Sequence, residues 1–344
     1  MTTLDYKQSG VDIDTANATK KQMAASLETN DSRVLNKIGA FASLFDGSFP
    51  LLKEPILVFK TEEPGSKQKL AFKYGRVASI CEDLINHLIN DIAVMGAYPL
   101  SVQDCIICGK MEKDVILQMV EAFSQACKAN ECVLTGGETS EQPGVLEAGT
   151  YVLTASVTGI VEKSKIIDGS RIEAGDVVLA LPSSGVHTNG FTLVRKIIEM
   201  QPEILKETVD GAPFIDAILT PHRSYFKVLK RIFELDGLTG LAHITGGGIR
   251  ENLDRILPQN LNAEIDISRL QILPVFKTLK QFGNLADADM MRTFNMGVGI
   301  TAVCRADSSD EIIRLLKEEN LECYPIGKIT EGEKKVELLG ELSW

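Results

Sequence analysis

The sequence predicts a mixed α/β protein of two domains, and three observations favour this fold class. Apolar, β-rich runs alternate along the chain with segments of helical periodicity. The length of 344 residues exceeds what a single core usually supports, about 250 to 300 residues. Turn signals at 168–169 and 175–176 are typical of a boundary. We therefore expect an N-terminal domain over 1–170 and a C-terminal domain over 171–344, with a ligand site between them.

The N-terminal half alternates runs typical of strands and helices. The helix predicted at 80–96 places Ile80, Leu84, Leu88 and Ile92 near one face. β-branched residues favour strands, and glycines are expected to end the strand that begins at Cys132. The predicted elements are a strand at 55–60, helices at 80–96 and 112–130, and strands at 132–137 and 150–162.

The C-terminal half shows the same alternation. Pro221 is well placed in the first turn of a helix predicted at 220–235, because proline suits that position. A helical pattern at 249–257 follows a glycine triplet. The other predicted elements are strands at 177–182, 240–245, 262–267, 296–304 and 323–330, and helices at 189–200 and 310–319.

The composition argues against several classes of protein. A formal net charge of −11 repels the phosphate backbone of nucleic acids, so we expect no nucleic-acid partner. No apolar run approaches ~18 residues and the N-terminus lacks an apolar signal region, which predicts a cytoplasmic protein without a membrane partner. The seven cysteines argue against a disulfide framework. Cys105 and Cys108 form a lone CxxC, which favours buried thiols over a zinc site.

Four glycine-bearing loops interrupt apolar strands. Glycine permits left-handed backbone and close approach, so such loops can direct several N–H groups at one anion. Each loop alone is more often a tight turn, but all four also carry serine, threonine, asparagine or histidine. The loops span 60–70, 135–144, 181–190 and 244–248.

Two of the four histidines, His187 and His243, lie in or beside these loops. An imidazole can transfer a proton near neutral pH or donate a hydrogen bond to phosphate. The alternative is a histidine that only holds a loop in place. His87, in the middle of a predicted helix, is expected to be structural, and the sequence leaves His222 open.

Carboxylates near the loops indicate a bound cation. Asp83 and Asp91 are eight positions apart on a predicted helix, which places them near one face, ~12 Å apart. Mg²⁺ prefers oxygen ligands and often joins carboxylates to substrate phosphates. Any single carboxylate is more often a solvated surface group. The residues alone therefore predict an enzyme that handles ATP or phosphate with Mg²⁺, without a P-loop or a GxGxxG motif. The other loop carboxylates are Glu62 and Glu63, beside Lys67, with Glu138 and Glu141.

Seven motifs in order resemble the phosphoribosylformylglycinamidine cyclo-ligase (AIR synthetase) family. The resemblance spans nearly the whole chain, and the segments SGVHTNG and HITGGG are its most specific parts. The motifs lie at 6–17, 90–100, 136–144, 161–170, 181–196, 242–258 and 291–300.

The resemblance implies a fold and a reaction. The fold is an N-terminal α/β domain, whose sheet forms a barrel across a homodimer, followed by a C-terminal α/β domain. The reaction closes the imidazole ring of formylglycinamidine ribonucleotide with ATP, giving aminoimidazole ribonucleotide. Phosphorylation turns the formyl oxygen into a good leaving group, and the amidine nitrogen of the substrate then attacks. Positioning and electrostatic stabilisation supply most of such catalysis.

The resemblance also implies roles for particular residues. His187 and Asn189, with Thr188 between them, would lie beside the reacting formyl group or the substrate phosphate, and His243 would add a proton-bearing donor. Lys67 would contact nucleotide phosphate, and Glu62 and Asp91 would bind Mg²⁺. Gly136, Gly137, Glu138 and Thr139 would line the ATP site, and Thr245, Gly246, Gly247 and Gly248 would hold phosphate at the start of a helix.

The chain departs from the family pattern mainly in its N-terminal half. The family loop TDGVGTK reads TEEPGSK at 61–67, so that Glu62 replaces a shorter carboxylate. A glycine-rich GGFGG reads GAFAS at 39–43, and a His-Asp pair is Val77 and Ala78. Two alternatives follow: a related ATP-dependent enzyme, similar to thiamine-monophosphate kinase, selenophosphate synthetase or the hydrogenase-maturation dehydratase, or a homologue that binds ligand without turnover. The first cysteine, Cys81, comes too late for the reactive residue typical of the selenium enzyme.

Overall fold

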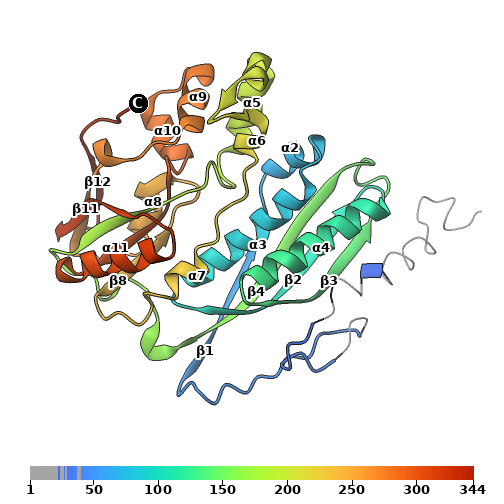
Figure 1. Cartoon of the computed structure of the whole chain (residues 1–344), viewed down its shortest axis with the longest axis horizontal. Coiled ribbons are helices and arrows are strands. Elements are labelled where there is room, and N and C mark those ends of the chain that lie inside the picture. The colour runs from blue at the N-terminus through green and yellow to red at the C-terminus, as the bar shows by residue number, and fades with distance from the viewer. Residues whose placement is uncertain (1–21, 24–26, 28, 37–39) are drawn as a thin grey trace, which may run out of the picture.

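The computed structural model describes residues 22–23, 27, 29–36 and 40–344 (Figure 1). The motif at 6–17 and Gly39 of the GAFAS segment lie outside these residues. The described chain forms two large sheets, one built from residues 55–162 and the other from residues 177–339. None of the helices described is both long and apolar enough to cross a membrane.

The first sheet has four strands and is covered by helices on one face. Its spatial order is β1-β4-β2-β3, with β2 and β3 parallel and the other pairs antiparallel. Helices α3 and α4 lie side by side across the same face, as Figure 1 shows. The elements are β1 Pro55–Glu62, α2 Lys67–Lys73, α3 Val77–Ala93, β2 Tyr98–Cys108, α4 Lys113–Ala129, β3 Val133–Glu141 and β4 Tyr151–Glu162.

Strand β3 continues through the glycines at which the sequence predicts its end. The pairing with β2 shifts by one residue between Val102 and Gln103, and Gly136 opposite this bulge has a φ of 144°. A Cβ atom at Gly137 would lie 2.2 Å from the backbone oxygen of Asp104. These glycines therefore keep the strand in register instead of ending it.

The second sheet has six strands in the order β12-β9-β11-β5-β10-β8, and only β12 and β9 pair in parallel. Every residue of β10 is buried, which makes this strand the centre of the C-terminal core.

The sequence did not predict helices α9 and α10 of the C-terminal half. The elements are β5 Val177–Pro182, α5 Phe191–Met200, β6 Thr208–Val209, β7 Ala212–Pro213, α6 Phe214–Ile218, α7 Phe226–Leu229, β8 Leu238–His243, α8 Gly248–Asp254, β9 Leu261–Asp266, α9 Pro274–Gly283, α10 Asp287–Thr293, β10 Val298–Cys304, α11 Ser309–Glu318, β11 Tyr324–Glu331 and β12 Val336–Leu339, with short 3-10 helices at Lys163–Lys165, Pro202–Lys206, Ile267–Arg269 and Ala306–Ser308.

The helix predicted at 220–235 is confirmed only at Phe226–Leu229, because residues 230–234 form turns and residues 220–225 form no helix. Side chains of α3 bind the backbone of this segment instead. Asn86 Nδ2 donates to the His222 carbonyl at 2.6 Å, and Asp83 Oδ1 accepts from the His222 amide at 2.7 Å. Asn90 makes two further bonds to this segment, at 2.8 Å each. These tertiary bonds satisfy backbone groups that a helix would otherwise pair internally, so they override the local helical preference.

Helix α3 has two buried faces of opposite character. The predicted apolar face is confirmed, because Ile80, Leu84, Leu88 and Ile92 are almost fully buried. The other face carries polar side chains at helical spacing and meets the C-terminal half of the chain. These residues are Asp83, Asn86, His87, Asn90 and Asp91.

Candidate active site

All four histidines of the chain meet at the boundary between its two halves. The rings of His187 and His222 stack with their centroids 3.9 Å apart. The His243 ring lies 5.1 Å from that of His222 and 5.2 Å from that of His87. All four side chains are buried. The cluster therefore joins α3, the loop after β5, the 220–225 segment and the end of β8 at one place.

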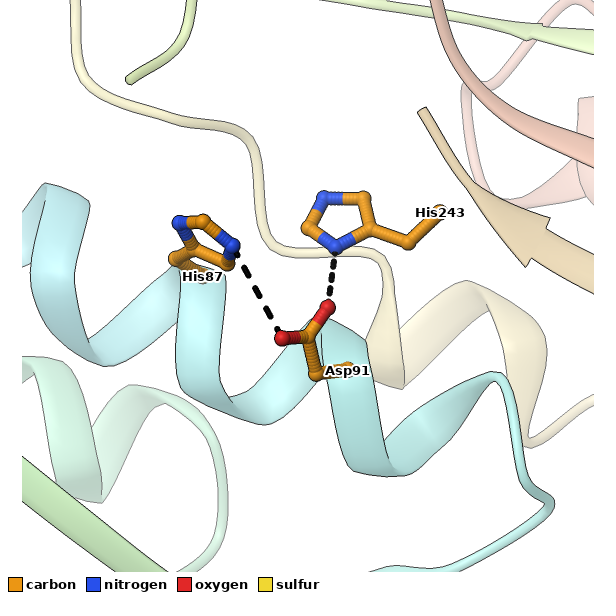
Figure 2. Close-up of side chains that lie close together, drawn as sticks. All are labelled: His87, Asp91 and His243. Carbon is orange, nitrogen blue, oxygen red and sulfur yellow. Dashed lines mark hydrogen bonds and ion pairs between the residues drawn. The ribbon is translucent and has the colours of Figure 1, made fainter. Parts of the chain in front are cut away.

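Helix α3 and strand β8 together position a His–Asp–His group (Figure 2). His87 and Asp91 lie one turn apart on α3, and His243 is the last residue of β8. The Nδ1 atom of His243 is 2.7 Å from Oδ1 of Asp91, and Nε2 of His87 is 3.7 Å from Oδ2 of Asp91. One carboxylate thus faces two imidazoles, as Figure 2 shows.

A chain of hydrogen bonds connects these rings. The Nε2 atoms of His243 and His222 are 3.0 Å apart. The Thr188 hydroxyl oxygen lies 3.4 Å from Nδ1 of His222 and 3.0 Å from Nδ1 of His87. The chain therefore runs from Asp91 through His243, His222 and Thr188 to His87, and this last ring points back at Asp91. Such a path can move a proton between its two ends.

Burial keeps most of this cluster uncharged. Desolvation, together with the neighbouring His243, lowers the pKa of His87 to about 4. Burial also holds the pKa values of His187 and His222 well below the usual value. For Asp91, burial alone would raise the pKa, but the His243 hydrogen bond and the nearby cations hold it well below the usual range. At neutral pH Asp91 is therefore an ionised carboxylate, and His87, His187 and His222 are neutral rings.

Glu62 and Asp91, the predicted magnesium ligands, lie close together with a lysine between them. The Lys60 ammonium is 2.9 Å from Glu62 Oε1 and 3.0 Å from Asp91 Oδ2. Glu62 is the last residue of β1, and Asp91 faces it from α3. Lys60 was missed from the sequence, although its spacing of two residues from Glu62 along a strand puts both on one face.

Three of the four glycine loops meet at this boundary. A Cβ atom at Gly65 would lie 3.4 Å from the Thr188 carbonyl oxygen, so the first loop lies beside the third. A Cβ atom at Gly246, in the fourth loop, would be 3.5 Å from Asn189 Oδ1. The remaining loop does not join them, because Gly136, Gly137, Glu138 and Thr139 lie on β3, at the edge of the sheet opposite to β1.

Two polar atoms of the 181–190 loop are buried without a hydrogen-bond partner among the described residues. They are Nδ1 of His187 and Nδ2 of Asn189. His187 has a φ of 62°, and its other nitrogen accepts from the Ser184 amide at 3.1 Å. Unsatisfied buried polar atoms are uncommon and costly, so they are candidates for bonds to a bound ligand. Ser184 and His222 also line a polar cavity of about 260 Å³.

Lys67 is completely buried and faces Asp83. Its ammonium is 2.7 and 2.8 Å from the two carboxylate oxygens of Asp83 and 3.0 Å from the Thr220 carbonyl. Burial lowers the pKa of Lys67 and raises that of Asp83 to about 6, so desolvation opposes both charges. The predicted contact with nucleotide phosphate stays a prediction. In this structure Lys67 holds α2, α3 and the C-terminal half together.

The glycine triplet has different roles at its three positions. Gly247 has a φ of 92°, and a Cβ atom at Gly248 would lie 2.0 Å from the Met291 carbonyl oxygen. Asn252 holds the loop by donating to the carbonyls of Thr245, Gly246 and Gly248. Of the three positions, Gly246 is the one where another residue would fit, because its backbone is not left-handed and no atom lies too close to an added Cβ. Its open side faces Asn189, where a ligand would lie.

The CxxC pair does not form a metal site. Cys105 and Cys108 are three residues apart on β2, so their side chains point to opposite faces of the sheet. Cys108 is buried and Cys105 is half-buried, and burial raises the pKa of both thiols. This agrees with the expectation of inert thiols. All seven cysteines are unpaired.

The fold and the site define a class of two-domain α/β proteins with a polar centre between the domains. Models for the AIR synthase related protein family match the chain twice, the N-terminal domain over residues 51–161 and the C-terminal domain over residues 173–339. The chain belongs to this family.

Among its relatives are proteins named phosphoribosylformylglycinamidine cyclo-ligase. Those of Burkholderia multivorans and Burkholderia cenocepacia are 41% and 42% identical to it over 334 residues, which cover 96% of this chain and 95% of each relative. The family resemblance read from the sequence is thereby confirmed.

Solved structures with much lower identity share the fold. HypE of E. coli superimposes with a TM-score of 0.70 at 16% identity, covering 94% of both chains. A hydrogenase maturation protein HypE in complex with ATP has a TM-score of 0.67 at 14% identity, covering 96% of this chain and 92% of HypE. Thiamine-monophosphate kinase of Stenotrophomonas maltophilia superimposes with a TM-score of 0.66 at 18% identity, covering 94% of this chain and 96% of the kinase. The predicted α/β fold class is confirmed by these likenesses.

Proposed function

We propose that this chain is an ATP-dependent cyclo-ligase of purine biosynthesis. It closes the imidazole ring of formylglycinamidine ribonucleotide and releases aminoimidazole ribonucleotide, ADP and phosphate. The observation that carries the proposal is the 41–42% identity to cyclo-ligases over 96% of the chain. The altered TEEPGSK loop suggested an alternative, a non-catalytic homologue or another ATP-dependent phosphoryl-transfer enzyme, which these relatives do not favour. A cytoplasmic location stays a prediction.

The histidine cluster suits the proton transfers of this reaction. Ring closure removes a proton from the attacking amidine nitrogen and needs hydrogen bonds to the developing oxygen leaving group. We assign this proton transfer to His243, because its bond to Asp91 fixes the position of the ring. The partnerless atoms His187 Nδ1 and Asn189 Nδ2 would bind the formyl oxygen or the phosphate of the substrate.

The nucleotide site is proposed to involve a second copy of the chain. The predicted ATP-binding residues on β3 lie at the sheet edge opposite to β1, where Lys60 and Glu62 lie. In a homodimer, β3 of one copy can lie near β1 of the other and bring these groups together. The ATP-bound relative of the same fold supports ATP as the phosphoryl donor.

Apolar side chains on the uncovered face of the first sheet support the homodimer. Leu57 and Phe59 on β1 are 49% and 70% exposed. Helices cover the other face of the sheet and leave this one open (Figure 1). Neighbouring apolar residues on an open face are typical of an interface. A barrel formed by two such sheets would bury them.

Magnesium is proposed to enter with ATP and not to occupy a preformed protein site. The space between Glu62 and Asp91 contains the Lys60 ammonium, and the groups next to Asp91 are imidazoles. Mg²⁺ demands an octahedron of oxygens, so these residues do not fit it as they stand. The dication that accompanies the ATP phosphates therefore belongs to the substrate.

The test is turnover with both products measured. Purified protein is mixed with Mg-ATP and formylglycinamidine ribonucleotide, and ADP and aminoimidazole ribonucleotide are quantified separately. Equal amounts of both support the cyclo-ligase. ADP without the imidazole would indicate another phosphoryl-transfer enzyme, and binding of the ribonucleotide without either product would indicate a non-catalytic homologue. An Asn189→Asp variant should lose turnover, whereas Asp266→Asn, at a partly exposed site on the second sheet, should not.

A further inference from the structure

We propose that His87, Asp91 and His243 form a binding site for a transition-metal dication that prefers imidazole ligands, such as Zn²⁺. One ligand atom from each residue lies within 4.8 Å of the others. These three side chains surround a common point in Figure 2. The proposed metal differs from Mg²⁺ in class, and binding needs neither ATP nor substrate.

An account of the protons in the hydrogen-bond chain supports a cation at this point. An ionised carboxylate only accepts, so the proton between Asp91 and His243 is on Nδ1 of His243. When this ring is neutral, its Nε2 accepts from Nε2 of His222. Nδ1 of His222 accordingly accepts from the Thr188 hydroxyl.

The remaining bond then determines the tautomer of His87. Having donated its only proton, Thr188 must accept from Nδ1 of His87 at 3.0 Å. Nε2 of His87 is left with a lone pair, which points at carboxylate oxygens of Asp91 and Glu62, 3.7 and 4.0 Å away. The Lys60 ammonium neutralises the two carboxylates in this structure, and a dication in its place would also bind the lone pair of His87. Binding at Nδ1 of His243 requires the proton of this ring to move to Nε2 and that of His222 to move to Nδ1, so that the Thr188 hydroxyl accepts from both His222 and His87.

The donor set and its support favour a transition metal. Two imidazoles with one or two carboxylates are typical ligands of Zn²⁺ and its neighbours, whereas Mg²⁺ seldom binds imidazole. The other nitrogen of each ligand ring is already bonded, His87 to Thr188 and His243 to His222. Such outer bonds orient ligand rings in metal sites. The three ligand atoms lie within 4.8 Å of one another, so small shifts of the side chains would bring them to one metal ion.

Lys60 competes for the same carboxylates. Its ammonium contacts Asp91 and Glu62, and it would repel an incoming dication. The side chain is 36% exposed, so it can withdraw into solvent. Its departure would free Glu62, whose Oε1 lies 4.0 Å from Nε2 of His87, as a fourth ligand. The affinity of the site should therefore increase when Lys60 loses its charge.

The experiment measures metal binding by the full-length chain after removal of metals with a chelator. Zn²⁺ is titrated calorimetrically, and Co²⁺ is added separately so that its visible absorption identifies the ligand types. We expect one Zn²⁺ per chain and a Co²⁺ spectrum of nitrogen and oxygen ligands. A thiolate-to-cobalt band would place the metal on cysteines and overturn the proposal.

Variants assign the ligands. His87→Gln should weaken Zn²⁺ binding by more than about tenfold, and Lys60→Met should strengthen it. The control is His187→Asn, because His187 lies in the same cluster but does not face the metal position, and asparagine tolerates its left-handed backbone. Unchanged affinity in a folded His87→Gln chain, or an equal loss in His187→Asn, would contradict the ligand set. The measurement uses no substrate, so its failure leaves the proposed reaction untouched.

Discussion

The Nδ1 atom of His243 lies 2.7 Å from Oδ1 of Asp91, and this bond joins the end of β8 to the middle of α3. The two residues are 152 positions apart in the chain. Because α3 packs on the first sheet and β8 belongs to the second, this bond connects the two halves of the chain. The rest of the site is arranged around it, with His222 and Thr188 on one side and Lys60 on the other.

Loss of the His243 imidazole should abolish most turnover. We expect His243→Gln to lower kcat by about 10²- to 10⁴-fold, as is typical for the loss of a general acid or base. Asp91→Asn should lower kcat less, because the ring remains but its charged form loses a partner. Steady-state kinetics of both products measure the effect, and circular dichroism checks the fold. A folded His243→Gln enzyme with wild-type kcat would remove His243 from the mechanism.

Removing one member of the buried Lys67–Asp83 pair should destabilise the protein strongly. Lys67→Met leaves Asp83 buried without a cation, so we expect a loss of about 3 to 5 kcal/mol in the free energy of unfolding. Urea denaturation measures this, and Lys67→Met with Asp83→Asn should recover part of the loss. The control is Lys163→Met in the exposed pair with Glu54, which should change stability by about 0 to 1 kcal/mol. Equal effects at both lysines would contradict this account.

Stability should fall as pH rises from about 4 to about 7 because of Asp104. Burial raises the pKa of Asp104 from 3.8 to about 7, so in this range the folded state binds more protons than the unfolded state. The ionised group then destabilises the fold by an amount on the order of a few kcal/mol, since each tenfold change in proton affinity is worth about 1.4 kcal/mol.

The measurement is urea denaturation at pH 5 and pH 8. Asp104→Asn should reduce the difference in unfolding free energy between these two pH values, and the exposed Glu207→Gln should leave it unchanged. An Asp104→Asn protein with the same pH dependence as the wild type would show that this carboxyl is not desolvated in the native state.

Charge on the open face of the first sheet should dissociate the proposed dimer. Phe59→Glu places a carboxylate where the second copy would pack, so the protein should become monomeric at micromolar concentration. Light scattering measures the mass. Leu339→Glu is the control, because Leu339 is 45% exposed on β12 of the other sheet and should leave the mass unchanged. If the Phe59→Glu protein has the same mass in solution as the wild type and the Leu339→Glu control, the interface lies elsewhere.

Alanine substitutions at Gly246 and Gly248 should have different effects on stability and on substrate binding. Gly248→Ala forces a Cβ atom to within 2.0 Å of the Met291 carbonyl at a φ of 64°, so the melting temperature should fall by several degrees. Gly246→Ala meets only Asn189 Oδ1 at 3.5 Å, so it should leave the melting temperature unchanged and raise KM for the ribonucleotide. Differential scanning calorimetry and kinetics distinguish the two, and an unstable Gly246→Ala protein would contradict the assignment.

The sequence by itself determined the family and many of the local elements. Apolar periodicity predicts the faces of α3 and most strands, because burial against a sheet demands such a pattern whatever the partner. The seven ordered motifs predict the family, which the comparisons confirm. His187 and His243 could be selected as candidates because they lie beside glycines.

Only the tertiary structure decided how the polar residues are used. His87 and His222 carry no local signal, and they join the site because α3 and the 220–225 segment meet there. The same contact prevents the helix predicted at Pro221, since the His222 amide bonds to Asp83, 139 positions away. Periodicity describes which side of an element is buried, but not against what. A polar stripe such as that of α3 becomes a site only when a distant segment supplies its hydrogen-bond partners.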